Sequence, residues 1–231
     1  MTRSWLFRHA IVLLLAAGLL YLFLYSRAEW SSMHRWNRAF GDVSFVLIAA
    51  AMVLGPLSRV SERRIFRRLL AYRREFGIYA ICAAFVHTVI ILVGWVELDL
   101  MRLFGFEFHP QLQRYVMVQH GFGLANAIGL AALTYGLVLA ATSNDLSQRV
   151  LGASVWKFIQ QATYVLWALS VVHTAYFLFL HFLDFHRRTP DPNWAQWPFV
   201  FLTVAVLLLQ WLATLSTWRR KRSLRGENQA G

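Results

Sequence analysis

The sequence has almost no cysteine: Cys82 is the only one in 231 residues. A single thiol excludes an intrachain disulfide, a cysteine zinc site and a cysteine-held iron–sulfur cluster. Because Cys82 lies inside an apolar run, we expect it to be a small packing residue.

Nucleotide-binding motifs are missing as well. The 13 glycines form no glycine-rich fingerprint of the dinucleotide-binding or P-loop type. We therefore expect no nicotinamide, flavin or ATP domain in this chain.

Charged residues are scarce, at 15% of the chain, whereas soluble domains average about 25%. Hydrophobic residues make up 58%, and several runs approach the roughly 20 apolar residues that cross a bilayer. The net charge of +12 raises the question of nucleic acid, but the basic residues sit in clusters beside the apolar runs, as membrane topology requires. We expect an integral membrane protein that contacts the lipid bilayer and binds no nucleic acid.

Hydropathy divides the chain into six apolar segments, each of which we expect to be a transmembrane helix. The expected fold is an all-α integral membrane protein, a six-transmembrane-helix bundle that forms one domain over residues 1–231. We expect the first segment to remain as a helix, because residues 25–28 make a poor signal-peptide cleavage site. The segments are Trp5–Tyr25, Phe40–Leu57, Phe76–Val96, Tyr115–Thr142, Phe158–Leu183 and Trp197–Trp218.

The distribution of basic residues predicts the orientation. With six spans both termini share one side, which collects 16 of the 23 lysines and arginines and leaves seven on the other. Because basic loops stay in the cytoplasm, we expect both termini to be cytoplasmic. The loop after the first segment, with Arg27, Arg35 and Arg38, is an exception on the outer side.

The apolar segments Phe76–Val93 and Phe158–Leu180 contain no Asp, Glu, Lys or Arg, and His87 and His173 are their only histidines. An ionisable group within a transmembrane helix is costly and suggests a functional site. His87 lies 13 residues beyond Arg74 and His173 lies 16 beyond Lys157, roughly 20 and 24 Å along parallel helices. Two imidazoles at similar depth could each supply one axial bond to a haem iron.

Two other interpretations of the histidines stay open, namely another metal and plain packing with a hydrogen bond to a carbonyl. Ala80, Ala83 and Ala84 share the helix face of His87 and would leave room for a flat macrocycle, although small residues also serve helix packing. His120, on the outer side, is a candidate for a quinone pocket. Arg102, Arg114, Arg187 and Arg188 are candidates to neutralise haem propionates.

Several motifs resemble those of the ferric-reductase-like transmembrane superfamily. Residues 73–80, read as Arg-Arg-Glu-Phe-Gly-Ile-Tyr-Ala, and the later Phe85-Val86-His87 resemble its third helix, and Gly55–Arg59 is similar to the end of its second. Leu151-Gly152, Trp156-Lys157, Tyr164 and Val172-His173 are similar to its fifth helix and the loop before it. The resemblance covers residues 40–180, and its nearest subset is the haem-binding membrane subunit of the bacterial periplasmic methionine-sulfoxide reductase system.

This resemblance implies a b-type haem at residues 40–180 and a multi-pass protein of the bacterial inner (cytoplasmic) membrane. Relatives stack two haems, but here Gln160 stands at one inner histidine position and Arg73 or Arg74 at the other. Neither glutamine nor arginine is a usual haem ligand, so we expect one haem per chain, held by His87 and His173.

The sequence thus predicts the electron-transfer subunit of an oxidoreductase, without catalytic residues of its own. Electrons would come from a cytosolic flavin reductase or a quinol, with a quinone or flavin as a further candidate cofactor. They would leave for an acceptor on the outer face, either a periplasmic redox partner or ferric iron. A quinol-oxidising cytochrome of the b561 type and a cofactor-free membrane scaffold or assembly factor remain alternatives.

Overall fold

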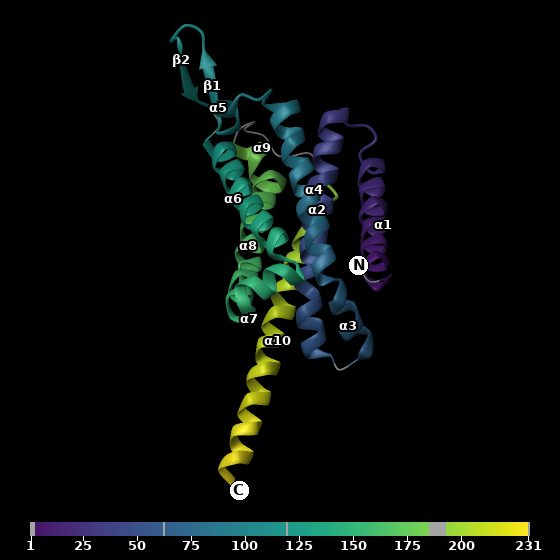
Figure 1. Ribbon diagram of the computed structural model, residues 1–231. Helices are drawn as coiled ribbons and strands as arrows, with labels where there is room; N and C mark the ends of the chain where they lie inside the picture. The colour runs from purple at the N-terminus through teal and green to yellow at the C-terminus, as the bar shows by residue number, and fades with distance from the viewer. Residues whose placement is uncertain (1–2, 62, 119, 185–192, 231) are drawn as a thin grey trace.

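The computed structural model describes residues 3–61, 63–118, 120–184 and 193–230 of the chain. Six helical segments among them are long and apolar enough to cross a bilayer, which confirms the expected all-α, six-span membrane fold. The helices run side by side, with the chain ends N and C at the lower ends of their helices and a short hairpin at the top (Figure 1).

The helices and strands follow one another in a simple order. They are α1 (Arg3–Tyr25), α2 (Ser32–Val60), α3 (Arg64–Leu69), a 3₁₀ turn η1 (Leu70–Tyr72), α4 (Arg73–Ile90), a π-helical segment η2 (Ile91–Trp95), α5 (Leu100–Leu103), β1 (Phe106–His109), β2 (Arg114–Met117), α6 (His120–Thr142), α7 (Asp145–Gln161), α8 (Thr163–Ala175), a second π-helical segment η3 (Tyr176–Leu180), α9 (His181–Asp184) and α10 (Gln196–Ala230).

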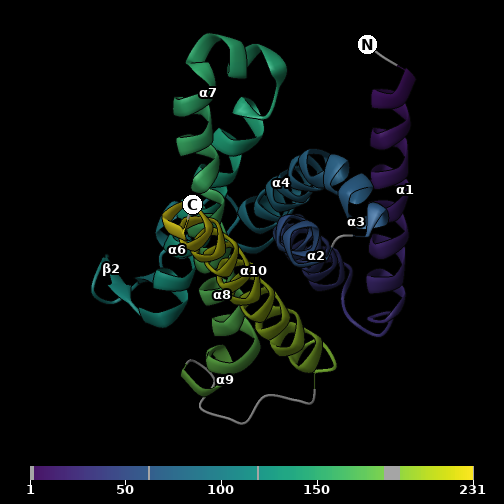
Figure 2. The same ribbon diagram turned by 90° about the horizontal axis from the view of Figure 1, so that it is seen from below.

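Helix α2 is the centre of the bundle. It packs against α1, α4 and α10, and viewed from below it lies between α1 and α10 (Figure 2). Its buried side chains include Leu47, Ala49 and Met52, all at most 2% exposed. The second helix pair, α6 and α8, packs against this group through α4 and α2. Because lipid is as apolar as these side chains, close van der Waals packing rather than burial from water stabilises such contacts.

Several span boundaries differ from the sequence prediction, among them the starts of the second and fourth spans. The second span begins at Ser32 rather than Phe40, so Arg35 and Arg38 lie within α2 instead of in a loop. The fourth begins at His120 rather than Tyr115, because Tyr115 belongs to strand β2. Hydropathy misses the first boundary because these arginines interrupt the apolar run, and the second because the aromatic residues of a strand also raise local hydropathy.

The hairpin was not predicted from the sequence. Strands β1 and β2 pair antiparallel, with Phe106 opposite Met117 and His109 opposite Arg114. Gln113, with a φ of 50°, closes the turn and donates from Nε2 to the Pro110 carbonyl oxygen at 2.6 Å. Alternating aromatic residues and a proline in the turn are the local signals for it.

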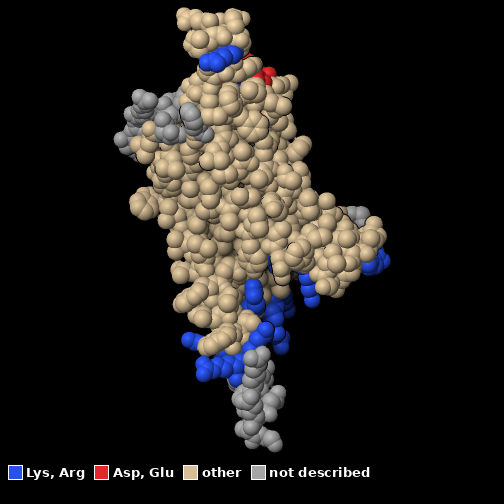
Figure 3. Space-filling view, turned by 90° about the vertical axis from the view of Figure 1, so that its left-hand side faces the viewer, with Lys and Arg blue, Asp and Glu red and all other residues tan. Residues whose placement is uncertain are grey.

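Charge is distributed unevenly between the two ends of the bundle. We call them the hairpin end, which carries β1 and β2, and the terminal end, where α1 begins and α10 ends (Figure 1). Lysines and arginines gather at the lower, terminal end of the face in Figure 3, beneath a broad uncharged band. The two buried charged residues among the described residues, Glu75 and Arg27, are both paired: Arg8 binds Glu75 at 2.8 Å between α1 and α4, and Arg27 binds Asp42. Pairing offsets the cost of holding these charges away from water.

Two glycines should respond oppositely to alanine. A Cβ at Gly123 in α6 would lie 2.0 Å from the Phe104 carbonyl oxygen, a backbone atom that cannot turn aside. We expect Gly123→Ala to cost about 1–3 kcal/mol. At Gly77 in α4 nothing lies within 4 Å, so Gly77→Ala should gain about 0.5–1 kcal/mol from helix propensity.

Thermal unfolding of the detergent-purified variants measures both effects. A lower midpoint for Gly123→Ala with an unchanged or higher midpoint for Gly77→Ala is the expected pattern. Equal midpoints would contradict the close approach of α6 to residue 104.

Candidate functional site

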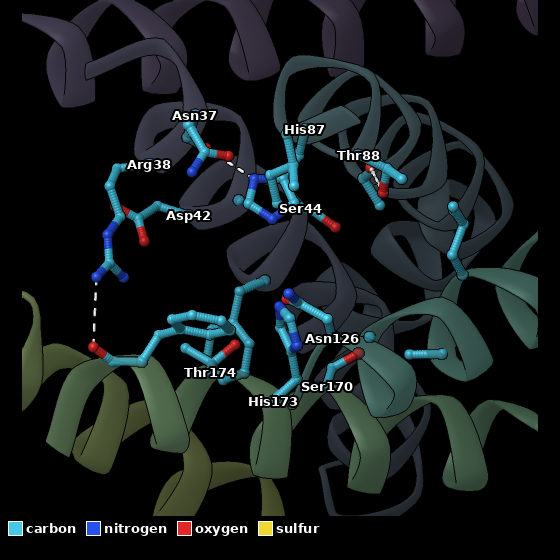
Figure 4. A pocket seen from close by; sticks show the side chains of 18 of the residues that line it. Asn37, Arg38, Asp42, Ser44, His87, Thr88, Asn126, Ser170, His173 and Thr174 are labelled. Atoms are coloured by element: carbon cyan, nitrogen blue, oxygen red, sulfur yellow. Dashed lines mark hydrogen bonds between the residues drawn. The ribbon is translucent and has the colours of Figure 1, made fainter. Parts of the chain in front are cut away.

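The imidazole rings of His87 and His173 face each other across the middle of the bundle. His87 projects from α4 and His173 from α8, and their ring centres lie 6.4 Å apart with the ring planes at 87° (Figure 4). The structure therefore brings together the two histidines that the sequence singled out.

Each imidazole is oriented by a backbone carbonyl of a neighbouring helix. His87 Nδ1 lies 2.8 Å from the Asn37 carbonyl oxygen of α2, and His173 Nδ1 lies 2.7 Å from the Ala125 carbonyl oxygen of α6. A carbonyl only accepts, so each Nδ1 must carry the proton and donate it. In the neutral ring the lone pair is then left on Nε2, which is the tautomer that binds a metal.

A glycine makes each of these hydrogen bonds possible. Gly41 and Gly129 follow the two carbonyl residues by one helical turn, and each imidazole lies over its glycine. A Cβ at Gly41 would lie 3.2 Å from His87 Nδ1, and one at Gly129 only 2.6 Å from His173 Nδ1. The same arrangement, a carbonyl residue followed by a glycine four positions later, thus occurs in α2 and in α6. The sequence analysis did not predict it, although a small residue in a transmembrane helix is a sign that another helix comes close there.

The two histidine helices also change geometry alike. After His87, α4 passes into the π-helical segment η2 at Ile91, and after His173, α8 passes into η3 at Tyr176. π-Helical turns are rare and are frequent at functional sites.

A cavity of about 540 Å³ surrounds the two imidazoles, within the range of about 300–1,000 Å³ that ligand pockets occupy. Apolar side chains line it toward the terminal end, among them Ile81, Leu133 and Leu166. Toward the hairpin end the lining is aromatic and polar, with Trp30, His34, Arg38, Trp95 and His181 among its members.

The donor set fits haem iron better than a bare metal ion. Among the described residues no group of three or more histidine, cysteine, aspartate or glutamate side chains could hold a metal. A structural or catalytic zinc takes three or four protein ligands, whereas a haem iron with four porphyrin nitrogens needs only two. His87 and His173 would therefore hold a haem through their Nε2 atoms, which are left free by the hydrogen bonds of Nδ1.

The other candidate residues differ in whether they reach the cavity. Ala84 lines the cavity, while Ala80 and Ala83 pack in the apolar core. His181, which the sequence analysis does not single out, also lines the cavity, and its ring centre lies 5.6 Å from that of Phe177 with the planes at 45°. The side chain of His120 lies outside the described part of the structure, as do Arg187 and Arg188.

None of the described arginines proposed as propionate partners lines the cavity. Arg102 pairs with Glu97 at 3.2 Å on the surface, and Arg114 lies in the hairpin. Arg38 lines the cavity instead. It was missed because it was expected to lie in a loop.

At the inner histidine position the side chains are engaged elsewhere. Gln160 Nε2 donates to Thr142 Oγ1 at 3.2 Å, and Arg74 Nη2 binds Asp145 Oδ1 at 2.7 Å.

Gly152 explains the kink within α7, before the fifth span. Its φ of 74° is one that glycine adopts without strain, and it separates the first turns of α7 from the rest.

Two curated relatives are similar over part of the chain. Magnetosome protein MamZ from Magnetospirillum gryphiswaldense and MamZ from Paramagnetospirillum magneticum are each 26% identical over 137 residues, or 59% of this chain. The chain spans only about a fifth of their length, since the match covers 19% of each.

A protein-family model described as "Ferric reductase like transmembrane component" matches residues 39–171. The match includes His87 and ends two residues before His173. It covers more than half of the chain, and it indicates a membrane electron-transfer protein. Together with the six spans and the facing histidines, it shows that the chain belongs to the family of ferric reductase like transmembrane components.

Proposed function

We propose that the chain is a membrane b-type cytochrome that passes single electrons to an acceptor on the outer face. His87 and His173 would hold one haem by their Nε2 atoms. The observation that carries this proposal is the 6.4 Å separation of two imidazoles whose Nδ1 atoms are both bound to carbonyls. A bound haem would take up and release one electron at its iron, while the protein supplies ligation and an apolar surrounding.

The orientation follows from charge. The terminal end carries most of the basic residues, so we infer that it faces the cytoplasm and that the hairpin end faces outward. The cavity then lies in the outer half of the bilayer. A bacterial inner membrane with a periplasmic acceptor, such as a methionine-sulfoxide reductase or ferric iron, agrees with the resemblance noted in the sequence.

We also infer that the chain holds a single haem. Gln160 and Arg74 stand where an inner ligand pair would be expected, and their polar groups are bound to Thr142 and Asp145. Glutamine and arginine are not usual iron ligands.

The first test is haem content and ligation. We expect purified protein to contain about one non-covalent b haem per chain by pyridine haemochrome assay. His87→Ala or His173→Ala should abolish the low-spin spectrum, because each removes one of two axial bonds. His109→Ala, in the hairpin, is the matched control and should leave the spectrum unchanged.

Two outcomes would count against the proposal. A content near two haems per chain would reveal a second ligand pair. A protein that takes up no haem when haem is abundant would favour the scaffold alternative.

A second test concerns the glycines beneath the imidazoles. Because a Cβ at Gly129 would lie 2.6 Å from the His173 ring, Gly129→Ala should displace that imidazole and lower haem retention severalfold. Gly41→Ala should act more weakly, since its Cβ would lie 3.2 Å from His87. Haem per chain after size-exclusion chromatography measures both, and the opposite order would show that the glycines do not seat the histidines.

A third test concerns the electron donor. His87 lies 13 residues beyond Arg74, so a flavin reductase at the cytoplasmic face would have to bridge roughly 20 Å. We expect slow reduction by a flavin reductase and faster reduction by quinol in membranes, as followed by stopped-flow absorbance. Rapid reduction by the flavin reductase in quinone-free detergent, with no second cofactor present, would refute the long gap.

A further inference from the structure

Arg38 is a guanidinium placed beside the histidine pair. It follows Asn37, whose carbonyl orients His87, and it lines the same cavity as both imidazoles (Figure 4). Its Nη2 donates to the Phe177 carbonyl oxygen at 3.3 Å, one turn beyond His173. The guanidinium therefore lies on the hairpin-end side of the two rings.

The nearest carboxylate is already engaged by another arginine. Asp42 Oδ2 accepts from Arg27 Nη2, and the Arg27 residue is only 3% exposed. The Arg27 guanidinium also lies 5.0 Å from the ring centre of Trp194, a cation–π contact that fixes it further. Among the residues whose side chains the structure describes, no carboxylate lies within salt-bridge distance of Arg38.

Arg27, Arg38 and Asp42 together carry one net positive charge, from two guanidiniums and one carboxylate. A charge within the bilayer is costly unless it is neutralised. A ferric b haem with two ionised propionates carries one negative charge overall. The site and its proposed ligand are therefore complementary, and an arginine fork suits a carboxylate in particular.

We propose that Arg38 binds a haem propionate, and that the Arg27–Asp42 pair keeps Asp42 from neutralising Arg38 instead. This inference rests on the proposed function. A haem held in this way would turn its propionates toward the hairpin end and its apolar edge toward Ile81, Leu133 and Leu166, which line the same cavity. Arg38 is thus a positioning residue, whose positive charge also favours the reduced iron.

The decisive experiment compares two porphyrins. Apoprotein of the full chain is titrated with haem and with haem dimethyl ester, which lacks the propionate charges. Arg38→Gln should weaken haem binding about tenfold or more and leave binding of the ester nearly unchanged. Arg38→Lys should recover part of the loss, because it restores the charge without the fork. Arg102→Gln is the control, since it removes an equal charge from the surface of the same end.

The reduction potential gives an independent readout. Removing a positive charge beside the iron disfavours electron uptake, so Arg38→Gln should lower the potential in a redox titration of the haem-loaded protein. A change of about tenfold in the reduction equilibrium corresponds to 59 mV for a one-electron couple. Arg102→Gln should leave the potential unchanged.

The outcomes separate this inference from the proposed function. If wild-type protein binds neither porphyrin, the cytochrome proposal itself fails. If wild type binds haem with a low-spin spectrum and Arg38→Gln matches Arg102→Gln in affinity and potential, only the role of Arg38 is overturned. Equal losses for haem and ester would likewise overturn it, because they would show a structural effect without charge recognition.

Discussion

The hydrogen bond from each imidazole Nδ1 to a backbone carbonyl is the interaction on which the site depends. It fixes the tautomer, so that Nε2 can bind a metal, and it fixes the direction of the ring. It also accounts for Gly41 and Gly129, because a side chain at either position would fill the space over which the imidazole lies. Removing any of these parts would leave a histidine in the membrane without a defined direction.

These bonds connect the site to the packing of the whole bundle. α2 supports the histidine of α4, and α6 supports that of α8, so the direction of each imidazole depends on one helix pair. In lipid, helices associate through close packing of small residues rather than by burial from water. The residues that let the helices approach are therefore the same ones that seat the imidazoles, and fold and site share one set of contacts.

The buried charges are neutralised by ion pairs. Arg8 and Glu75 neutralise each other, as do Arg27 and Asp42, while most of the remaining basic side chains lie at the terminal end. Arg38 differs, because it lines the cavity beside two imidazoles and has no carboxylate partner among the described residues. A cation kept at such a place is costly unless an anion joins it, which is the physical reason for the propionate role proposed for Arg38.

The sequence by itself determined the membrane class, the six spans and the two histidines, because apolar composition and an isolated ionisable residue are both local features. It placed the start of the second span too late and missed the hairpin, where arginines and aromatic residues mislead a hydropathy window. Only the tertiary structure decided which carbonyls hold the imidazoles, which glycines make room for them and that Arg38 enters the cavity. The reason is distance along the chain: Asn37 lies 50 residues from His87 and Ala125 lies 48 from His173, and no local pattern encodes which helix faces of a bundle meet.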